Sequence, residues 1–72
     1  MADVEMVPVS SSNIAAVGYD EEQQRLIVMF KGGGRYAYDG VEPEVYKSFL
    51  GAGSKGRFLD QNIKGSYPFS RI

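Results

Sequence analysis

The residues best suited to bind a ligand lie in one short stretch, Ser54-Lys55-Gly56-Arg57. Serine is a preferred N-cap residue, so Ser54 predicts the start of a short helix. The free backbone N–H groups after it would point outward beside two cations, and Gly56 would let a ligand approach closely, which suits a phosphate. Lys64 follows about two helical turns later, on nearly the same face. The alternative is a capped helix start with solvated cations, and a Ser-Lys-Gly tripeptide is by itself a weak signal for a ligand.

Two tyrosines on a predicted strand are the second candidate. Tyr36 and Tyr38 alternate, so both rings project from one face. They could stack on bases, where each stack is worth ~1–3 kcal/mol. The alternative, which we favour, is that they pack beneath a helix while their hydroxyl groups reach the rim. A predicted helical face is available to cover them, formed by Val45, Tyr46, Phe49 and Leu50.

Two polar turns have a ligand-binding interpretation and a structural one. Asn13, after Ser11 and Ser12, could read a ligand by hydrogen bonds, but such residues also form turns at a strand entry, which we slightly prefer. The glycines of 32–34, between Lys31 and Arg35, could hold an anion through backbone amides. They do not lead into a helix, so a flexible hairpin tip is the favoured interpretation.

The composition gives little support to catalysis. The 72 residues include no cysteine and no histidine, which removes thiolate metal sites and the commonest general base. A nucleophilic serine would have only carboxylates and lysines as its base. Two acidic runs, 20–22 and 39–44, could hold Mg²⁺ but lie in polar connections, where a solvated face is the usual explanation. We expect a non-enzymatic binding protein without a metal or cofactor.

The charge is unevenly distributed along the chain. The formal net charge is −1, but residues 1–46 hold three basic and eight acidic residues, whereas residues 47–72 hold five basic and one acidic residue. A basic C-terminal third could meet a polyanion. We favour the simpler interpretation, that it complements the acidic part of the same fold.

Periodicity predicts the elements that would position these residues. After a lead-in over residues 1–8, strands are expected at 14–19, 25–30 and 35–38, joined as an antiparallel meander. The apolar Ile27 and Met29 indicate that the second sheet face is covered by a helix or another subunit. Short helices are expected from Pro43 and from Ser54. The composition of residues 67–72 predicts an extended segment, which Pro68 confines to a sheet edge if it pairs at all. The predicted class is α+β: a three-stranded antiparallel meander with two short C-terminal helices over residues 9–72.

Location and assembly follow from size and composition. No apolar run approaches the roughly 20 residues that span a bilayer, and the acidic start does not resemble a signal peptide. The absence of cysteine fits a reducing compartment, so a cytoplasmic protein is expected. So short a chain buries only about 60% of its unfolded surface, and homo-oligomer formation would bury more.

Six segments fall in the order and spacing of a known family. They are Ser11-Ser12-Asn13-Ile14-Ala15-Ala16-Val17-Gly18-Tyr19-Asp20, Tyr36-Ala37-Tyr38, Val45-Tyr46, Ser54-Lys55-Gly56, Ile63-Lys64 and Tyr67-Pro68-Phe69. On these the chain, from about Val9 to Ile72, resembles the KTSC domain, which occurs at the C-terminus of some lysyl-tRNA synthetases and as small free-standing bacterial and phage proteins. Glu42, Phe58 and Asp60 depart from the family pattern, which often has proline, tyrosine and asparagine there.

The resemblance implies a binding role. RNA binding has been proposed for the family, and small phage proteins that sequester cyclic nucleotides offer a looser analogy. The leading hypothesis is therefore a phosphate-bearing ligand, either RNA or a nucleotide, and a cyclic-nucleotide sponge if the chain is phage-encoded. Ser54, Lys55, Gly56, Arg57 and Lys64 would hold phosphate, and Tyr36, Tyr38 and Asn13 would contact the rest. The alternative is a homo-oligomeric protein-interaction module.

Overall fold

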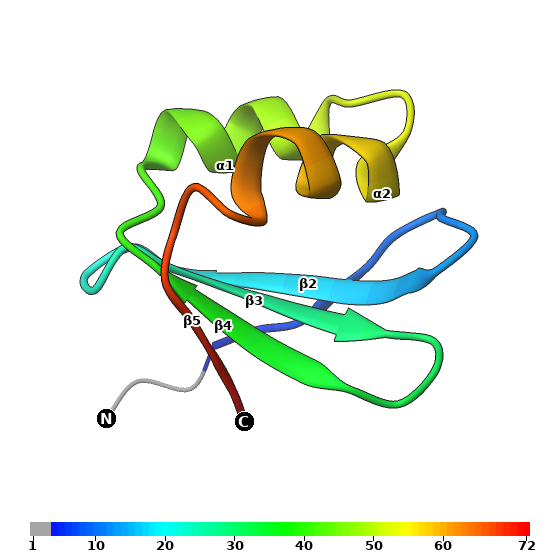
Figure 1. Ribbon diagram of the computed structural model, residues 1–72, viewed down its shortest axis with the longest axis horizontal. Helices are drawn as coiled ribbons and strands as arrows, with labels where there is room; N and C mark the ends of the chain where they lie inside the picture. Colours follow the sequence, from blue (N-terminus) through cyan, green and yellow to red (C-terminus); the bar gives the residue numbers. More distant parts are fainter. Residues whose placement is uncertain (1–3) are drawn as a thin grey trace.

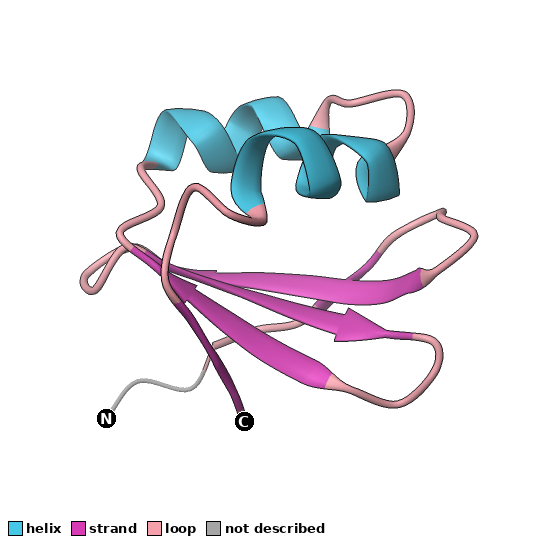
Figure 2. Ribbon diagram, viewed as in Figure 1, coloured by secondary structure: helices cyan, strands magenta, loops and turns pink. Residues whose placement is uncertain are grey.

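The chain forms two layers, a sheet and a set of short helices on one of its faces (Figures 1 and 2). The computed structural model describes residues 4–72. All neighbouring strands pair antiparallel, and they lie in the sheet in the order in which they occur in the chain. The strands are β1 (Val7–Pro8), β2 (Ile14–Asp20), β3 (Arg25–Phe30), β4 (Arg35–Asp39) and β5 (Phe69–Arg71).

The sheet has five strands, so the predicted three-stranded meander was wrong in strand number. The small α+β fold with an antiparallel sheet and helices is confirmed. The additional strands are the two edges, each of two or three residues and each next to a proline or containing one. Strands this short carry no readable periodicity, and pairing with a long neighbour defines them. β1 falls within the predicted lead-in, whose residues 1–3 lie outside the described part of the chain.

A bulge in β2 aligns its apolar residues with the core. Ile14 pairs with Phe30 and Val17 with Val28, and the register shifts between Ile14 and Ala16. Strict alternation would place Ile14 and Val17 on opposite faces, but an extra residue in one strand restores both to the same face. Both side chains are fully buried beside Leu26. We call this helix-covered side of the sheet the inner face.

The helical layer covers the inner face through a few large apolar side chains. It comprises α1 (Pro43–Leu50), α2 (Lys55–Phe58) and η1, a π-helical turn over Leu59–Ile63. Phe49, Leu59 and Ile63 are buried against the sheet. The helix predicted from Ser54 is thus divided, because the backbone N–H of Lys64 donates to the carbonyl of Leu59 at 2.8 Å, one residue further back than in an α-helix.

A tyrosine pair fixes α1 to the sheet. Tyr19 on β2 stacks on Tyr46 of α1, with ring centroids 4.7 Å apart and an interplanar angle of 11°. The Tyr19 hydroxyl donates to the carbonyl of Val41, which anchors the connection that enters the helix. Burial raises the pKa of both tyrosines, and nearby acidic residues add to the shift at Tyr19. Both hydroxyls therefore stay protonated, and able to donate, at neutral pH.

The N-terminal segment passes over the outer face of the sheet. A Cβ atom at Gly18 would lie 2.6 Å from Cγ1 of Val4 and 2.8 Å from Sδ of Met6, so only glycine admits this approach. Gly18 pairs with Ile27, which is half-buried like Met29. The expected cover on this face, a helix or another subunit, is supplied at Gly18 by the chain itself. No helix within residues 4–72 is long and apolar enough to cross a membrane.

Phe49 should contribute much of the stability that holds the two layers together. Its side chain is 0% exposed, whereas the adjacent Leu50 is 39% exposed. We expect Phe49→Ala to lower the free energy of unfolding by about 3–5 kcal/mol, because a large cavity is left in the core. Leu50→Ala, the matched control, should cost about 1 kcal/mol or less. Urea denaturation followed by circular dichroism measures both, and equal losses would contradict this assignment of the core.

Candidate functional site

A groove of about 760 Å³ opens on the inner face of the sheet, where the helical layer ends. Its walls come from the start of β4, from β5, from the β3–β4 loop and from the residues directly after η1. We call it the inner groove. Its aromatic lining is Phe30, Tyr36, Tyr38 and Phe69, and its polar lining is Asn13, Lys64 and Arg71.

The four aromatic rings form one connected cluster. Tyr36 meets Phe30 edge-on at a centroid distance of 5.7 Å and Phe69 at 5.7 Å, and Phe69 also contacts Tyr38 at 5.8 Å. Tyr38 is a core residue at 2% exposure, whereas Phe69 is 58% exposed. Tyr38 therefore forms the buried floor of the groove and Phe69 its exposed side. The face of the Phe69 ring that is open to water is available to stack on a flat ligand.

The hydroxyl of Tyr38 belongs to the groove rather than to the core. Every buried side-chain polar atom in residues 4–72 has a hydrogen-bond partner, yet the Tyr38 hydroxyl makes none of the hydrogen bonds in this part of the chain, so it is reached from the groove. Burial raises its pKa, and Tyr36 and Asp60 raise it further. Tyr38 thus presents a neutral donor to whatever fills the groove.

Two cations stand at the rim of the inner groove. Nζ of Lys64 lies 3.4 Å from Oδ1 of Asp60, but both side chains are more than half exposed, and such a pair is worth little. Arg71 makes no ion pair with any residue of the described chain. Both cations are therefore available to an anion at small energetic cost.

Asn13 reaches the groove from the loop before β2, and Gly56 lets it do so. Oδ1 of Asn13 accepts a hydrogen bond from Oγ of Ser11 at 3.2 Å. A Cβ atom on Gly56 would lie 2.6 Å from that same Oδ1. The glycine of the Ser-Lys-Gly motif is thus required for contact between α2 and Asn13, whereas the sequence suggested that a ligand would fill this space.

The structure separates the predicted site residues into two groups. Asn13, Tyr36, Tyr38 and Lys64 line the inner groove together. Ser54, Lys55 and Arg57 do not line it. Oγ of Ser54 caps α2 by accepting from the backbone N–H of Arg57 at 3.4 Å, and Nζ of Lys55 donates to the carbonyl of Ala52 at 3.4 Å.

Sequence reasoning missed three residues of the groove, namely Phe30, Phe69 and Arg71. Phe30 continues the inner-face alternation of Leu26 and Val28, so its position was readable. Phe69 and Arg71 reach the inner face because they pair with Tyr38 and Tyr36. Their spacing of two was visible, but only the β4–β5 register tells which face they occupy.

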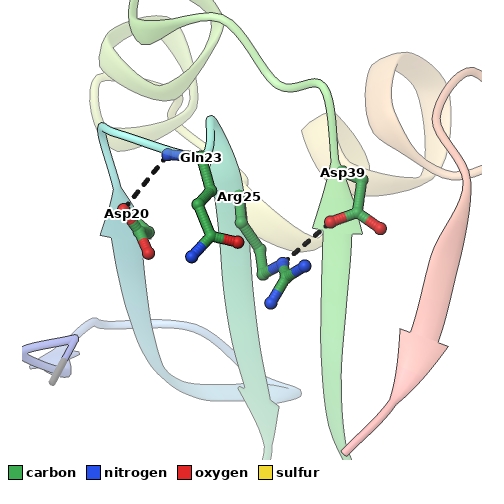
Figure 3. Close-up of polar contacts among 4 residues, drawn as sticks. All are labelled: Asp20, Gln23, Arg25 and Asp39. Carbon is green, nitrogen blue, oxygen red and sulfur yellow. Dashed lines mark hydrogen bonds and ion pairs between the residues drawn. The ribbon is translucent and has the colours of Figure 1, made fainter. Parts of the chain in front are cut away.

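The acidic residues of the two polar connections lie outside the inner groove, and two of them, Asp20 and Asp39, have structural partners. Figure 3 shows Oδ1 of Asp20 accepting from the backbone N–H of Gln23 at 3.2 Å, and Nε of Arg25 paired with Oδ1 of Asp39 at 2.8 Å. Within residues 4–72 no three acidic side chains gather closely enough to hold a metal ion. The polar chemistry of this end of the sheet is that of turns and strand pairing.

Replacing Gly56 tests its contact with Asn13. Gly56→Ala should displace the Asn13 side chain, because the new Cβ would overlap Oδ1. Gly53→Ala is the matched control, since a Cβ there meets nothing within 4 Å. We expect the Asn13 side-chain amide signals to shift in NMR spectra of the first variant and to stay in place in the second. Unshifted Asn13 signals in Gly56→Ala would contradict the contact.

Comparison with known proteins places this architecture in a family. The KTSC domain family matches residues 10–67. A protein of Tsukamurella paurometabola is 48% identical over 59 residues, 82% of this chain and 88% of that protein. A protein of Stutzerimonas stutzeri is 43% identical over 67 residues, 92% of this chain and 94% of its own. The crystal structure of a KTSC domain protein from Yersinia pestis superimposes with a TM-score of 0.94 at 40% identity, covering 97% of this chain and 99% of that one. The chain belongs to the KTSC domain family.

Proposed function

We propose that this domain is a non-enzymatic binding module for a ligand that carries both a base and a phosphate, either RNA or a nucleotide, and that the inner groove is its site. One observation carries the proposal. The groove combines an open aromatic face, a buried tyrosine whose hydroxyl is free and two cations at the rim. Flat aromatic surface beside positive charge is the combination by which proteins hold unpaired nucleotides.

The base would stack on Phe69. This ring is the most exposed of the cluster, and Tyr36 supports it from the side at 5.7 Å. Stacking of this kind contributes roughly 1–3 kcal/mol per base and tolerates any base, because every base has a π-face. Selection would come from hydrogen bonds. The Tyr38 hydroxyl and the Asn13 amide lie on the groove lining, where they can meet base edges or a ribose.

The phosphate would meet Lys64 and Arg71 at the rim. Arginine can bind a phosphate through two parallel N–H groups, and lysine adds a point charge. This placement moves the phosphate away from the stretch 54–57, where the sequence pattern located it. In that stretch the Ser54 hydroxyl caps α2 and Lys55 donates to a backbone carbonyl, so that only Arg57 remains as a solvated cation.

The absence of catalysis is part of the proposal, and the groove lining supports it. The residues of the inner groove include no carboxylate, and the chain has no histidine. The tyrosine on its floor has a raised pKa, which makes it a poor base at neutral pH. A bound nucleotide would therefore be held without being cleaved.

Variants of the groove test the proposal against a panel of 5′-mononucleotides, cyclic dinucleotides and fluorescein-labelled tRNA. We expect Phe69→Ala and Arg71→Ala each to weaken binding of the ligand that binds best by about tenfold, through loss of a stack or of a charged contact. Arg57→Ala is the matched control, since this exposed cation lies outside the groove, and its affinity should stay within about twofold of the parent. Anisotropy or calorimetry measures the affinities, and melting temperatures confirm folding. Equal weakening by Arg57→Ala would place the phosphate at α2 instead.

The second candidate function is self-association, and one observation favours it. β5 is an edge strand, and exposed apolar side chains lie at its first residue, Phe69, at 58%, and at the residue after it, Ile72, at 56%. Edge strands of this kind can pair with another chain. A sedimentation mass of one 7.9 kDa chain at high concentration excludes this candidate. A mass of two chains that Phe69→Ala returns to one supports it.

A further inference from the structure

A second hollow, of about 570 Å³, lies beyond the rim of the inner groove. Its cationic lining is Lys31, Arg35 and Arg71. Met29 also lines it, and Met29 pairs with Arg35 on the face of the sheet opposite to Val28 and Tyr36. We call it the outer hollow. It shares Phe30 and Arg71 with the inner groove, so the two depressions meet at the β3–β4 end of the sheet.

We propose that the inner groove and the outer hollow form one continuous path for a single-stranded polynucleotide, in which Lys31 and Arg35 bind phosphates that follow the nucleotide held on Phe69. This inference rests on the proposed function and makes it more specific, because it names a chain of several nucleotides as the ligand. A mononucleotide or a small cyclic nucleotide would fill the inner groove alone.

The cations of the outer hollow make no ion pair within residues 4–72. The ion pairs found in residues 4–72 join Arg25 to Asp39 and Lys64 to Asp60, and neither involves a cation of the outer hollow. Arg35 and Arg71 lie on neighbouring strands, one residue out of register, since Arg71 pairs with Tyr36. By register the two residues start from opposite faces of the sheet, yet both line the outer hollow at its edge. Consecutive phosphates of one polynucleotide could meet these cations in series.

The hairpin between the two depressions leaves the path open. Gly32 and Gly33 carry no side chains, and a Cβ atom built on either would meet nothing within 4 Å. The tip is nevertheless held in place, because the backbone N–H of Lys31 donates to the carbonyl of Asn13 at 2.9 Å and that of Phe30 donates to the carbonyl of Gly34 at 2.9 Å. A strand of nucleic acid could cross the glycines of this tip between Lys31 and Arg35, whose backbone positions are fixed.

Shape alone would also allow two independent ligands, one in each depression. The shared residues argue against that arrangement. Arg71 lines both depressions, so two separate anions would compete for it, whereas consecutive phosphates of one chain can share it. Phe30 likewise forms part of both walls and gives the path an apolar surface between its charged ends.

The test combines ligand length with a double substitution. Fluorescein-labelled single-stranded RNAs of one, three, six and nine nucleotides, with DNA of matched length, are titrated at several salt concentrations. The double variant Lys31→Ala/Arg35→Ala is compared with the parent. Lys47→Ala/Arg57→Ala is the matched control, because it removes the same charge from exposed helical positions outside both depressions. Melting temperatures establish that all variants are folded.

We expect affinity to rise at least tenfold from one to six nucleotides. The Lys31→Ala/Arg35→Ala variant should lose most of that gain and keep the mononucleotide affinity, and its slope of log affinity against log salt should fall by about 1.4, or 0.7 for each lost phosphate contact. In the control variant, both the gain in affinity with ligand length and the salt slope should equal those of the parent. If mononucleotides bind as tightly as hexamers, or if the double variant behaves like the control, the proposal of a continuous path is wrong. The inner groove would then remain the proposed site for a single nucleotide. If no probe binds the parent, the proposed function fails and this inference fails with it.

Discussion

The burial of one face of a longer sheet beneath a shorter helical layer is the constraint on which the rest of this structure depends. α1 has eight residues and is about 12 Å long, whereas the seven residues of β2 extend about 23 Å. Phe49, Leu59 and Ile63 are buried against the inner face and Tyr46 packs beside them, whereas Phe30 and Tyr36 stay partly exposed. The β3–β4 turn at one end of the sheet extends beyond the helical layer (Figure 1).

The residues at that end have the composition of a binding surface. Aromatic rings take the positions that a core would fill with aliphatic side chains, and cations stand where the rim meets water. A fully covered sheet would have buried Tyr36 and Phe69 entirely. Instead the rings support one another in tilted and edge-on contacts, which keeps them ordered while one face stays open. The same incomplete cover that weakens the core thus creates the inner groove.

Much of the fold could be predicted from sequence because its long elements carry strong periodicity. The central strands and α1 follow from alternation, from proline at a helix start and from an i, i+4 apolar pattern. The edge Val7–Pro8 could not be predicted, since it is too short to show a period and exists through its partner. For residues 67–72 an extended segment at a sheet edge was expected from Pro68, but only pairing with β4 makes Phe69–Arg71 a strand. The bulge in β2 was equally hidden, because one extra residue changes the facing of Ile14 without altering composition.

The candidate site shows the same division between local and distant information. Tyr36 and Tyr38, which were proposed from their alternation on a strand, and Lys64, which was proposed from its helical spacing after Arg57, line the inner groove. The contact at Gly56 could not be predicted, because its close neighbour, Asn13, is distant in sequence and only the packing of α2 brings the amide to this glycine. Phe69 and Arg71 were not predicted as site residues for a related reason, since they reach the groove through the β4–β5 register, which depends on the tertiary structure.

The order of the strands has a consequence for how the groove comes into being. β2, β3 and β4 are joined by short turns, so their pairing closes only small loops and can form early during folding. β5 pairs with β4 only after the chain has returned through the whole helical layer, which makes it the one long-range closure among the strand pairs. The ring of Phe69 and the guanidinium of Arg71 therefore reach their places last. The three-residue β5, like the two-residue β1 at the other edge, should open more readily than the central strands, so a ligand that binds Phe69 and Arg71 would stabilise one of the least stable parts of the sheet.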